Sequence, residues 1–324
     1  MHNNLQDLTD CVLGIDTSNY KTSVAVIDAA GNIVCDYRQL LRVKQGERGL
    51  RQSDALFQHV MNLPDLIKRC FSEMDPARIK AVACSDKPRP VEGSYMPVFN
   101  TGIGMAESIA ASLKVPCYRF SHQEGHIEAI RFRTVMENEP ELLCYHLSGG
   151  TCELLKVTGE GIDIIGGSKD ISFGQVIDRV GVKLGMQFPA GEYMDKAALE
   201  ADVSSKHLKK INTDGLYFNL SGIETQAGRK ADELLSANKD PSELIRETMD
   251  KLADLLIRVT EKACESTSIN KVVFTGGVSS SKYISGILNR YFDKKNIFIE
   301  FGDQNLSQDN AVGIALLGGK KLWL

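Results

Sequence analysis

The chain has no long hydrophobic run and no strong excess of charge of either sign. No apolar stretch approaches the ~20 residues that span a bilayer, so a membrane-spanning protein is not expected. The 38 basic and 42 acidic residues give a net charge of −4. This balance excludes the broad basic surface of a protein that binds nucleic acid unaided. Contact with RNA would need a local basic patch or a partner.

Paired cysteines are also missing. The eight cysteines are scattered, with no Cys-x-x-Cys pair, which disfavours a zinc ribbon or a disulfide framework. We therefore expect buried, reduced thiols in a cytoplasmic protein. Residues 1–10 are polar and acidic, unlike a secretory signal.

Short apolar strands alternate with amphipathic helices along the 324 residues. A hairpin pattern followed by helices occurs twice, which predicts a duplicated α/β fold with a nucleotide-binding cleft between its halves. The expected domains are residues 1–118 and 119–310, with a C-terminal helix over 311–324 that packs on the first. The expected strands are 12–16, 22–27, 33–36, 79–84, 115–120, 143–147, 152–157, 161–165 and 271–275, and the expected helices include 53–74, 103–113, 172–184 and 241–266.

The first long helix carries an apolar stripe, and Pro64 predicts a break or kink within it. The stripe consists of Leu56, Val60, Leu63, Leu66 and Ile67.

Two histidines one helical turn apart, His122 and His126, form the most informative pattern. Residues four apart share a helix face, so both imidazoles can reach one metal ion. With the distant Asp309 they would make an open site with room for a phosphate or a water. Taken alone, such a pair is more often a surface or packing coincidence than a metal site.

Two glycine turns are candidate nucleotide sites. Gly276 and Gly277 follow the strand at 271–275, and the segment from Leu147 through Ser148, Gly149 and Gly150 to Thr151 joins two strands. Free backbone amides at such turns accept phosphates, although both patterns also occur as plain tight turns.

Carboxylates downstream could bind a ribose diol, or could be ordinary exposed helix acids. They are Asp178 and Asp195, with Gly191 between them.

The order of the motifs resembles the TsaD family, also called Gcp and once described as glycoproteases, within the actin/hexokinase-like superfamily. Seven segments match its motifs in order from about Val12 onward. They are Leu13-Gly-Ile-Asp-Thr-Ser18, His122-Gln-Glu-Gly-His-Ile127, Ser148-Gly-Gly150, Phe188-Pro-Ala-Gly191, Phe218-Asn-Leu-Ser-Gly-Ile-Glu-Thr225, Gly276-Gly-Val-Ser279 and Asp309-Asn-Ala311.

The resemblance implies an enzyme that transfers a threonylcarbamoyl group from threonylcarbamoyl-AMP to a tRNA adenosine. His122, His126 and Asp309 would hold one divalent ion, iron or zinc. An adenine nucleotide, ATP or acyl-AMP, would be bound by the segment 147–151 and other residues. These are Asp178, Gly191, Gly276, Gly277 and Ser281. Family members work with TsaB-like partner proteins, and no membrane is implied.

Several positions depart from the family pattern, and most of them change the charge of the side chain. Two acids become Tyr20 and Lys21, another becomes Gln175, and a lysine becomes Glu224. Ser281 replaces an asparagine that contacts nucleotide, and the loop at 85–95 replaces a Gly-Pro-Gly turn. These changes are those expected of a divergent paralogue.

His146 stands two residues before Ser148, where some relatives carry a metal-ligating tyrosine. It is either a further metal ligand or an interior strand histidine bonded to a carbonyl.

The leading hypothesis is therefore a TsaD-like transferase, and the alternative is a non-catalytic or regulatory paralogue that binds nucleotide and a protein partner. A zinc protease is disfavoured, because Glu124 lies about 200° round the helix from His122 at ~100° per residue. No sugar-kinase pattern is visible. Candidate RNA contacts, which could equally be solvated surface, are Arg42, Lys44, Arg48, Arg51, Lys87, Arg89 and 206–210.

Overall fold

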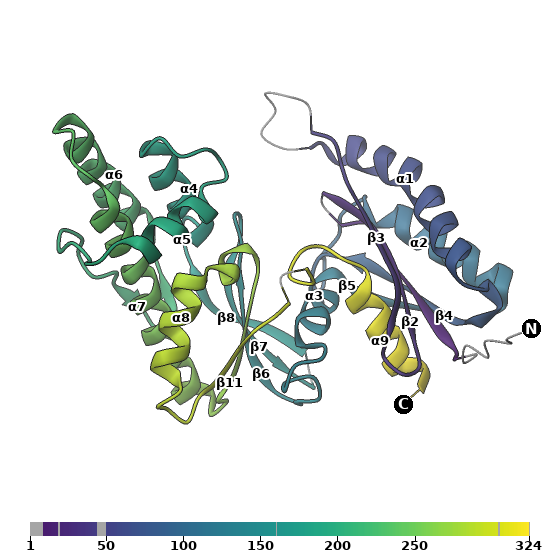
Figure 1. The fold of residues 1–324 in the computed structure, drawn as a ribbon. Helices are drawn as coiled ribbons and strands as arrows, with labels where there is room; N and C mark the ends of the chain where they lie inside the picture. The colour runs from purple at the N-terminus through teal and green to yellow at the C-terminus, as the bar shows by residue number, and fades with distance from the viewer. Residues whose placement is uncertain (1–8, 19, 44–49, 160, 304, 324) are drawn as a thin grey trace, which may run out of the picture. The chain divides into compact units, whose positions relative to one another are not determined.

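The computed structural model describes residues 9–18, 20–43, 50–159, 161–303 and 305–323. It forms two compact α/β units, residues 1–132 with 305–324 (unit 1) and residues 133–304 (unit 2) (Figure 1). The expected boundary lay at 118/119, whereas this division puts residues 119–132 and Asp309 in unit 1. The expected RNA contacts Lys44 and Arg48 lie outside the described residues.

Unit 1 contains a five-stranded mixed sheet in the order β3-β2-β1-β4-β5. Strands β1 to β3 form an antiparallel meander, while β4 and β5 run parallel to β1. The strands are β1 (Cys11–Asp16), β2 (Lys21–Asp28), β3 (Ile33–Leu40), β4 (Ile79–Lys87) and β5 (Cys117–Ser121).

Both faces of this sheet are covered, as the unbroken burial of β1 requires. Leu13 and Ile15 point to the face packed by α1 (Gln52–Glu73) and α2 (Phe99–Leu113). Val12, at the intervening position, points to the opposite face and packs against α9 (Val312–Trp323). Helix α3 (His122–Arg131) packs against α9 on that second face.

Helix α1 runs unbroken for 22 residues with Pro64 inside it, so the break that its sequence allowed does not occur. The apolar stripe is also displaced. Val60 is 47% exposed, whereas His59 is fully buried. The buried histidine is accommodated because its Nδ1 lies 2.9 Å from Thr22 Oγ1 on β2. Burial lowers the pKa of His59 to about 4, which keeps the imidazole neutral.

The expectation that all eight cysteines are reduced is wrong for one pair. Cys35 on β3 and Cys70 on α1 form a disulfide with a Cα–Cα distance of 6.1 Å. The other six cysteines are free. The sequence could not reveal this pair because α1 brings together residues separated by 35 positions.

Unit 2 contains a seven-stranded sheet in the order β12-β11-β6-β7-β8-β10-β9. Its strands are β6 (Leu142–Leu147), β7 (Cys152–Thr158), β8 (Gly161–Ser168), β9 (Thr213–Asp214), β10 (Tyr217–Phe218), β11 (Lys271–Thr275) and β12 (Phe298–Phe301). Its helices are α4 (Phe173–Lys183), α5 (Gly191–Glu200), α6 (Ser221–Ser236), α7 (Ser242–Thr267) and α8 (Lys282–Phe292).

One large hydrophobic core joins this sheet to its helices. Leu143, Tyr145 and Leu147 of β6 contribute alternate side chains to it, and α7 contributes the longest buried stripe. In Figure 1 helices α4 to α8 gather beside strands β6 to β8 and β11.

None of the helices in the described part of the chain is both long and apolar enough to cross a membrane.

Candidate functional site

Helix α3 begins with a capping box that fixes the first histidine. Ser121 Oγ accepts from the Glu124 backbone N–H at 3.2 Å, and the Glu124 carboxylate accepts from the Ser121 N–H at 2.7 Å. Glu124 is therefore bound to the helix start, which removes it as the general base of a zinc protease. The Ser-x-x-Glu spacing was visible in the sequence but was not used there.

The two histidines and Asp309 meet at one point in unit 1. Asp309 Oδ1 lies 3.1 Å from His126 Nε2 and 3.5 Å from His122 Nε2. One donor atom from each residue lies within 4.8 Å of the other two. Ligands about 2.1 Å from a tetrahedral ion stand roughly 3.4 Å apart, so the donor atoms fit a divalent ion such as zinc or iron.

The loop that carries Asp309 is held by its neighbour. The Asn310 side chain donates to the carbonyls of Leu306 (2.9 Å) and Gln308 (2.8 Å) and accepts from the Val312 N–H at 2.9 Å. Asn310 is only 4% exposed. Its amide thus caps α9 and fixes the turn just before it, a role that sequence analysis missed.

Asp16 at the end of β1 supports the site from behind. Its Oδ1 lies 3.2 Å from His122 Nδ1, and Ser18 and Ser85 donate their hydroxyl protons to the fully buried carboxylate. A carboxylate on Nδ1 orients a histidine so that Nε2 faces the metal. Sequence analysis quoted Asp16 within a motif but gave it no role.

The carboxylates of Asp16 and Asp309 stabilise a positive charge on His122, and the two histidines stabilise the negative charge of Asp309. Burial alone would lower the pKa of His122, but the charges and hydrogen bonds of Asp16 and Asp309 raise it to about 10. Burial opposes ionisation of Asp309, yet the two histidines hold its pKa well below the usual range. A bound cation would replace the imidazole proton in neutralising both carboxylates.

Lys21 is a departure from the family pattern that lies close to this site. Its ammonium donates to the side-chain oxygen of Gln308, the residue next to Asp309. Burial lowers the pKa of Lys21, and the charge of Asp309 acts in the opposite direction. A cation thus stands beside a candidate metal ligand, at a position where the family resemblance implied an acid.

In unit 2 the glycine turns lie next to each other. Gly276 has a φ of +93°, and a Cβ there would come within 2.3 Å of the Leu147 carbonyl oxygen, so only glycine fits. Within the 147–151 hairpin, Ser148 Oγ accepts from the Thr151 N–H at 2.9 Å. Ser172, at the start of α4, donates to the Gly149 carbonyl at 2.7 Å.

Two side chains proposed to bind nucleotide are already used within the protein. Asp178 on α4 accepts from the Ala190 N–H at 2.7 Å, just before Gly191 begins α5. Ser281 donates to Asp195 on α5 and accepts from the Ile284 N–H at 3.1 Å, which caps α8.

These contacts link the candidate nucleotide residues into a continuous ring of segments within unit 2. The ring comprises 147–151, α4, the start of α5 and the turn from Gly276 to Ser281.

His146 lies on β6 in unit 2, opposite Glu153 of β7 and Thr275 of β11. The three clustered ligands all belong to unit 1. The role of His146 as a further metal ligand stays a prediction.

The chain is similar in sequence to known proteins. The TsaD family model, described as tRNA N6-adenosine threonylcarbamoyltransferase, matches residues 20–316. The protein of that name from Neorickettsia sennetsu is 30% identical over 308 residues, covering 94% of this chain and 91% of that protein. The one from Thermotoga neapolitana is 27% identical and covers 96% and 94%.

Solved structures with low sequence identity share the fold. A ROK family transcriptional regulator superposes with a TM-score of 0.60 at 12% identity, covering 99% of this chain and 79% of that one. Component A of the Acidaminococcus fermentans (R)-2-hydroxyglutaryl-CoA dehydratase gives 0.55 at 14%, covering 97% and 99%. The fold is thus of the actin/hexokinase-like class, as expected. Because the family model spans nearly the whole sequence, the chain belongs to the TsaD family of tRNA N6-adenosine threonylcarbamoyltransferases.

Proposed function

We propose that the chain transfers a threonylcarbamoyl group from threonylcarbamoyl-AMP to a tRNA adenosine, using a divalent iron or zinc ion. The observation that carries this proposal is the convergence of His122, His126 and Asp309, with donor atoms within 4.8 Å, in a chain of this family. When bound, the metal would supply a Lewis acid that polarises the acyl carbonyl.

Other residues of the chain would orient the metal ligands and bind the nucleotide. Asp16 holds the Nδ1–H of His122, so that Nε2 stays directed at the ion. The ring of segments in unit 2 would bind the adenine nucleotide. Asp178 and Ser281 already make internal hydrogen bonds. The backbone amide of Gly149 in the 147–151 hairpin and those of Gly191, Gly276 and Gly277 would therefore provide most of the contacts to phosphate.

The test is threonylcarbamoyl transfer to unmodified tRNA, measured by nucleoside mass spectrometry in the presence of TsaB-like and other family partner proteins. We expect product from the unaltered chain. The His122→Ala variant should lose at least 100-fold in rate, because one of three ligands is gone. Asn289→Ala is the control, since Asn289 is exposed on α8 and lies outside the candidate site, and it should retain full activity.

Absence of product while a working TsaD control is active would refute the proposal. The alternative would then apply, in which the chain is a regulatory paralogue that binds nucleotide and a protein partner. Lys21 is the observation that favours this alternative, because it places a cation beside Asp309. Metal loading without turnover would be its expected result.

A further inference from the structure

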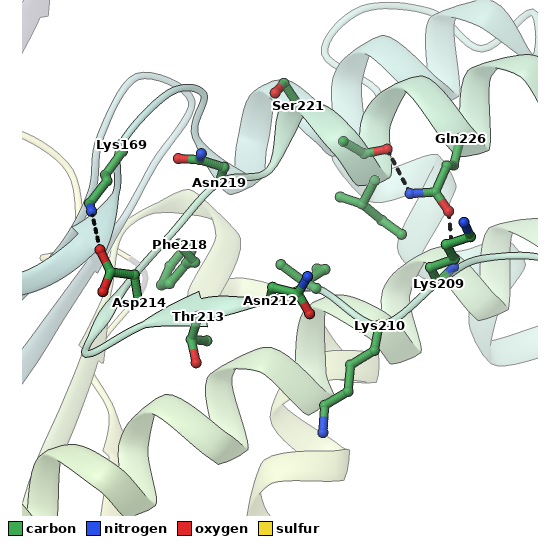
Figure 2. Close-up of a pocket in the computed structure, with 13 residues that line it drawn as sticks. Lys169, Lys209, Lys210, Asn212, Thr213, Asp214, Phe218, Asn219, Ser221 and Gln226 are labelled. Carbon is green, nitrogen blue, oxygen red and sulfur yellow. Dashed lines mark hydrogen bonds and ion pairs between the residues drawn. The ribbon is translucent and has the colours of Figure 1, made fainter.

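Unit 2 has a basic pocket that is separate from the ring of nucleotide segments and includes two of the candidate RNA contacts, Lys209 and Lys210. Its volume is about 600 Å³, and it lies between the end of β8, the β9–β10 hairpin and the start of α6. Lys169 lines one side and Lys209 and Lys210 line the other, with Asn212 and Phe218 between them (Figure 2).

The segment that carries two of these lysines is held in a fixed shape. The buried carboxylate of Glu247 accepts from the His207 and Leu208 N–H groups, each at 2.8 Å. Gln226 on α6 accepts from the Lys209 N–H at 3.0 Å, and Arg258 donates to the Ile211 carbonyl at 2.8 Å. Side chains of α6 and α7 therefore hold this wall of the pocket in place without a ligand.

The pocket is positively charged. Three lysines and one aspartate line it, a balance of +2. Asp214 pairs with Lys169 at 2.7 Å, whereas within the described chain no carboxylate is found in a salt bridge with Lys209 or Lys210. The neighbouring Asp170 is directed to the Leu220 and Ser221 N–H groups at the start of α6. Two exposed ammonium groups thus remain available to an anion.

We propose that this pocket binds the phosphodiester backbone of the tRNA substrate. The inference rests on the proposed function for the identity of the RNA. Because the whole chain carries a charge of −4, RNA must be held by a local basic site. Lys209 and Lys210 contact phosphates, and the side-chain amides of Asn212 and Asn219 in the lining can hydrogen-bond to ribose hydroxyls.

The test is fluorescence anisotropy with labelled, unmodified tRNA over a range of KCl concentrations, using the full chain without acyl donor. The Lys209→Gln/Lys210→Gln variant should bind about tenfold more weakly at low salt. Its slope of log K against log[salt] should fall by about 1 to 2, because each lost phosphate contact removes roughly 0.7–0.9. The matched control is Lys239→Gln/Lys294→Gln, which removes the same charge from exposed lysines of unit 2 outside the lining. It should bind like the unaltered chain.

Equal weakening in both double variants would overturn the proposal, because general charge and not the pocket would then hold the RNA. Unchanged tRNA affinity in the pocket variant, or no binding by the unaltered chain, would overturn it too. Calorimetry with inorganic phosphate distinguishes a further outcome. If only the pocket variant loses phosphate binding and its tRNA affinity is unchanged, the pocket is a site for small anions and not for tRNA.

The experiments distinguish failure of the proposed transfer reaction from failure of the proposed tRNA binding by the pocket. Absent transfer with pocket-dependent tRNA binding refutes only the reaction. Active transfer with pocket-independent tRNA binding refutes only the pocket.

Discussion

Two charged residues act on the metal ligands in opposite directions. Asp16 adds a negative charge behind His122, whereas Lys21 adds a positive charge close to Asp309. A divalent cation is attracted by the first and repelled by the second. At an effective dielectric of 80 to 20, two unit charges about 4 Å apart interact by about 1 to 4 kcal/mol.

Replacing Lys21 with glutamine should therefore tighten metal binding. We expect the Kd for Zn²⁺ to fall about fivefold, equivalent to ~1 kcal/mol, because the repulsion is removed while the hydrogen-bonding length is nearly kept. Competition with a chromophoric chelator at fixed pH measures this change.

Asp16→Asn is the control with the opposite sign, since it keeps the shape of the side chain but removes its charge. It should weaken Zn²⁺ binding by roughly 10- to 100-fold. Weaker binding in Lys21→Gln would show that the Lys21–Gln308 contact organises the site, contrary to the electrostatic argument.

Residue spacing predicted part of the site and could not predict the rest. The four-residue interval of His122 and His126 follows from helix geometry, and the structure brings Asp309 to them. By contrast, the internal partners of Asp178 and Ser281 are Ala190, just before α5, and Asp195 on α5, and could not be read from either motif. Lys169 faces Lys209 across a pocket only because β8 and β9 belong to one sheet.

At the level of elements, the crossing of α3 and α9 brings the metal ligands together. The two helices meet through glycines, and a Cβ on Gly313 would lie 1.8 Å from the Gly125 carbonyl oxygen. His126 follows Gly125, and Asp309 lies in the turn before α9. Any separation of the helices would therefore pull the histidine and the aspartate apart.

Gly313→Ala should destabilise the protein and weaken its metal site together. We expect a loss of about 1–3 kcal/mol in the free energy of unfolding, because the backbone must shift to admit the methyl group. Zn²⁺ affinity should fall by at least tenfold. Urea denaturation and chelator competition measure the two effects.

Gly286→Ala is the matched control, because it lies within α8 and its Cβ would meet nothing within 4 Å. It should be neutral or stabilising by about 0.5–1 kcal/mol, as expected for alanine in a helix interior. Unchanged metal affinity in Gly313→Ala would show that the close crossing of α3 and α9 is not needed for metal binding.

Element patterns predicted most strands and the long helices but not the details of α1. Its pattern of apolar residues placed Val60 inside, yet His59 is buried there because Thr22 on β2 offers a hydrogen bond. That partner belongs to a distant strand, so no local pattern contains it. The disulfide between Cys35 and Cys70 depends on the same packing of α1 against the sheet.

At the scale of the whole molecule, each unit has its own hydrophobic core, and the metal ligands belong to only one of them. Ion binding should therefore stabilise unit 1 selectively. At a free Zn²⁺ concentration of 100 times Kd, linkage predicts about 2.7 kcal/mol of added stability.

Hydrogen exchange read by mass spectrometry can test this selectivity. Peptides from β1, α3 and α9 should gain protection on adding Zn²⁺, while those from α7 and β11 should not. The His122→Ala variant should show no gain in either unit. Equal protection of both units in the unaltered chain would contradict the prediction.

The order of segments along the chain has a consequence for synthesis on the ribosome. Unit 1 is discontinuous, since α9 packs on one face of its sheet and Asp309 supplies a candidate metal ligand from beyond residue 304. All of unit 2 is therefore translated before unit 1 can close, so the inserted unit is free to fold first. A nascent chain stalled before residue 309 would hold only two of the three ligands. Capture of an ion by all three residues would therefore come after the translation of unit 2.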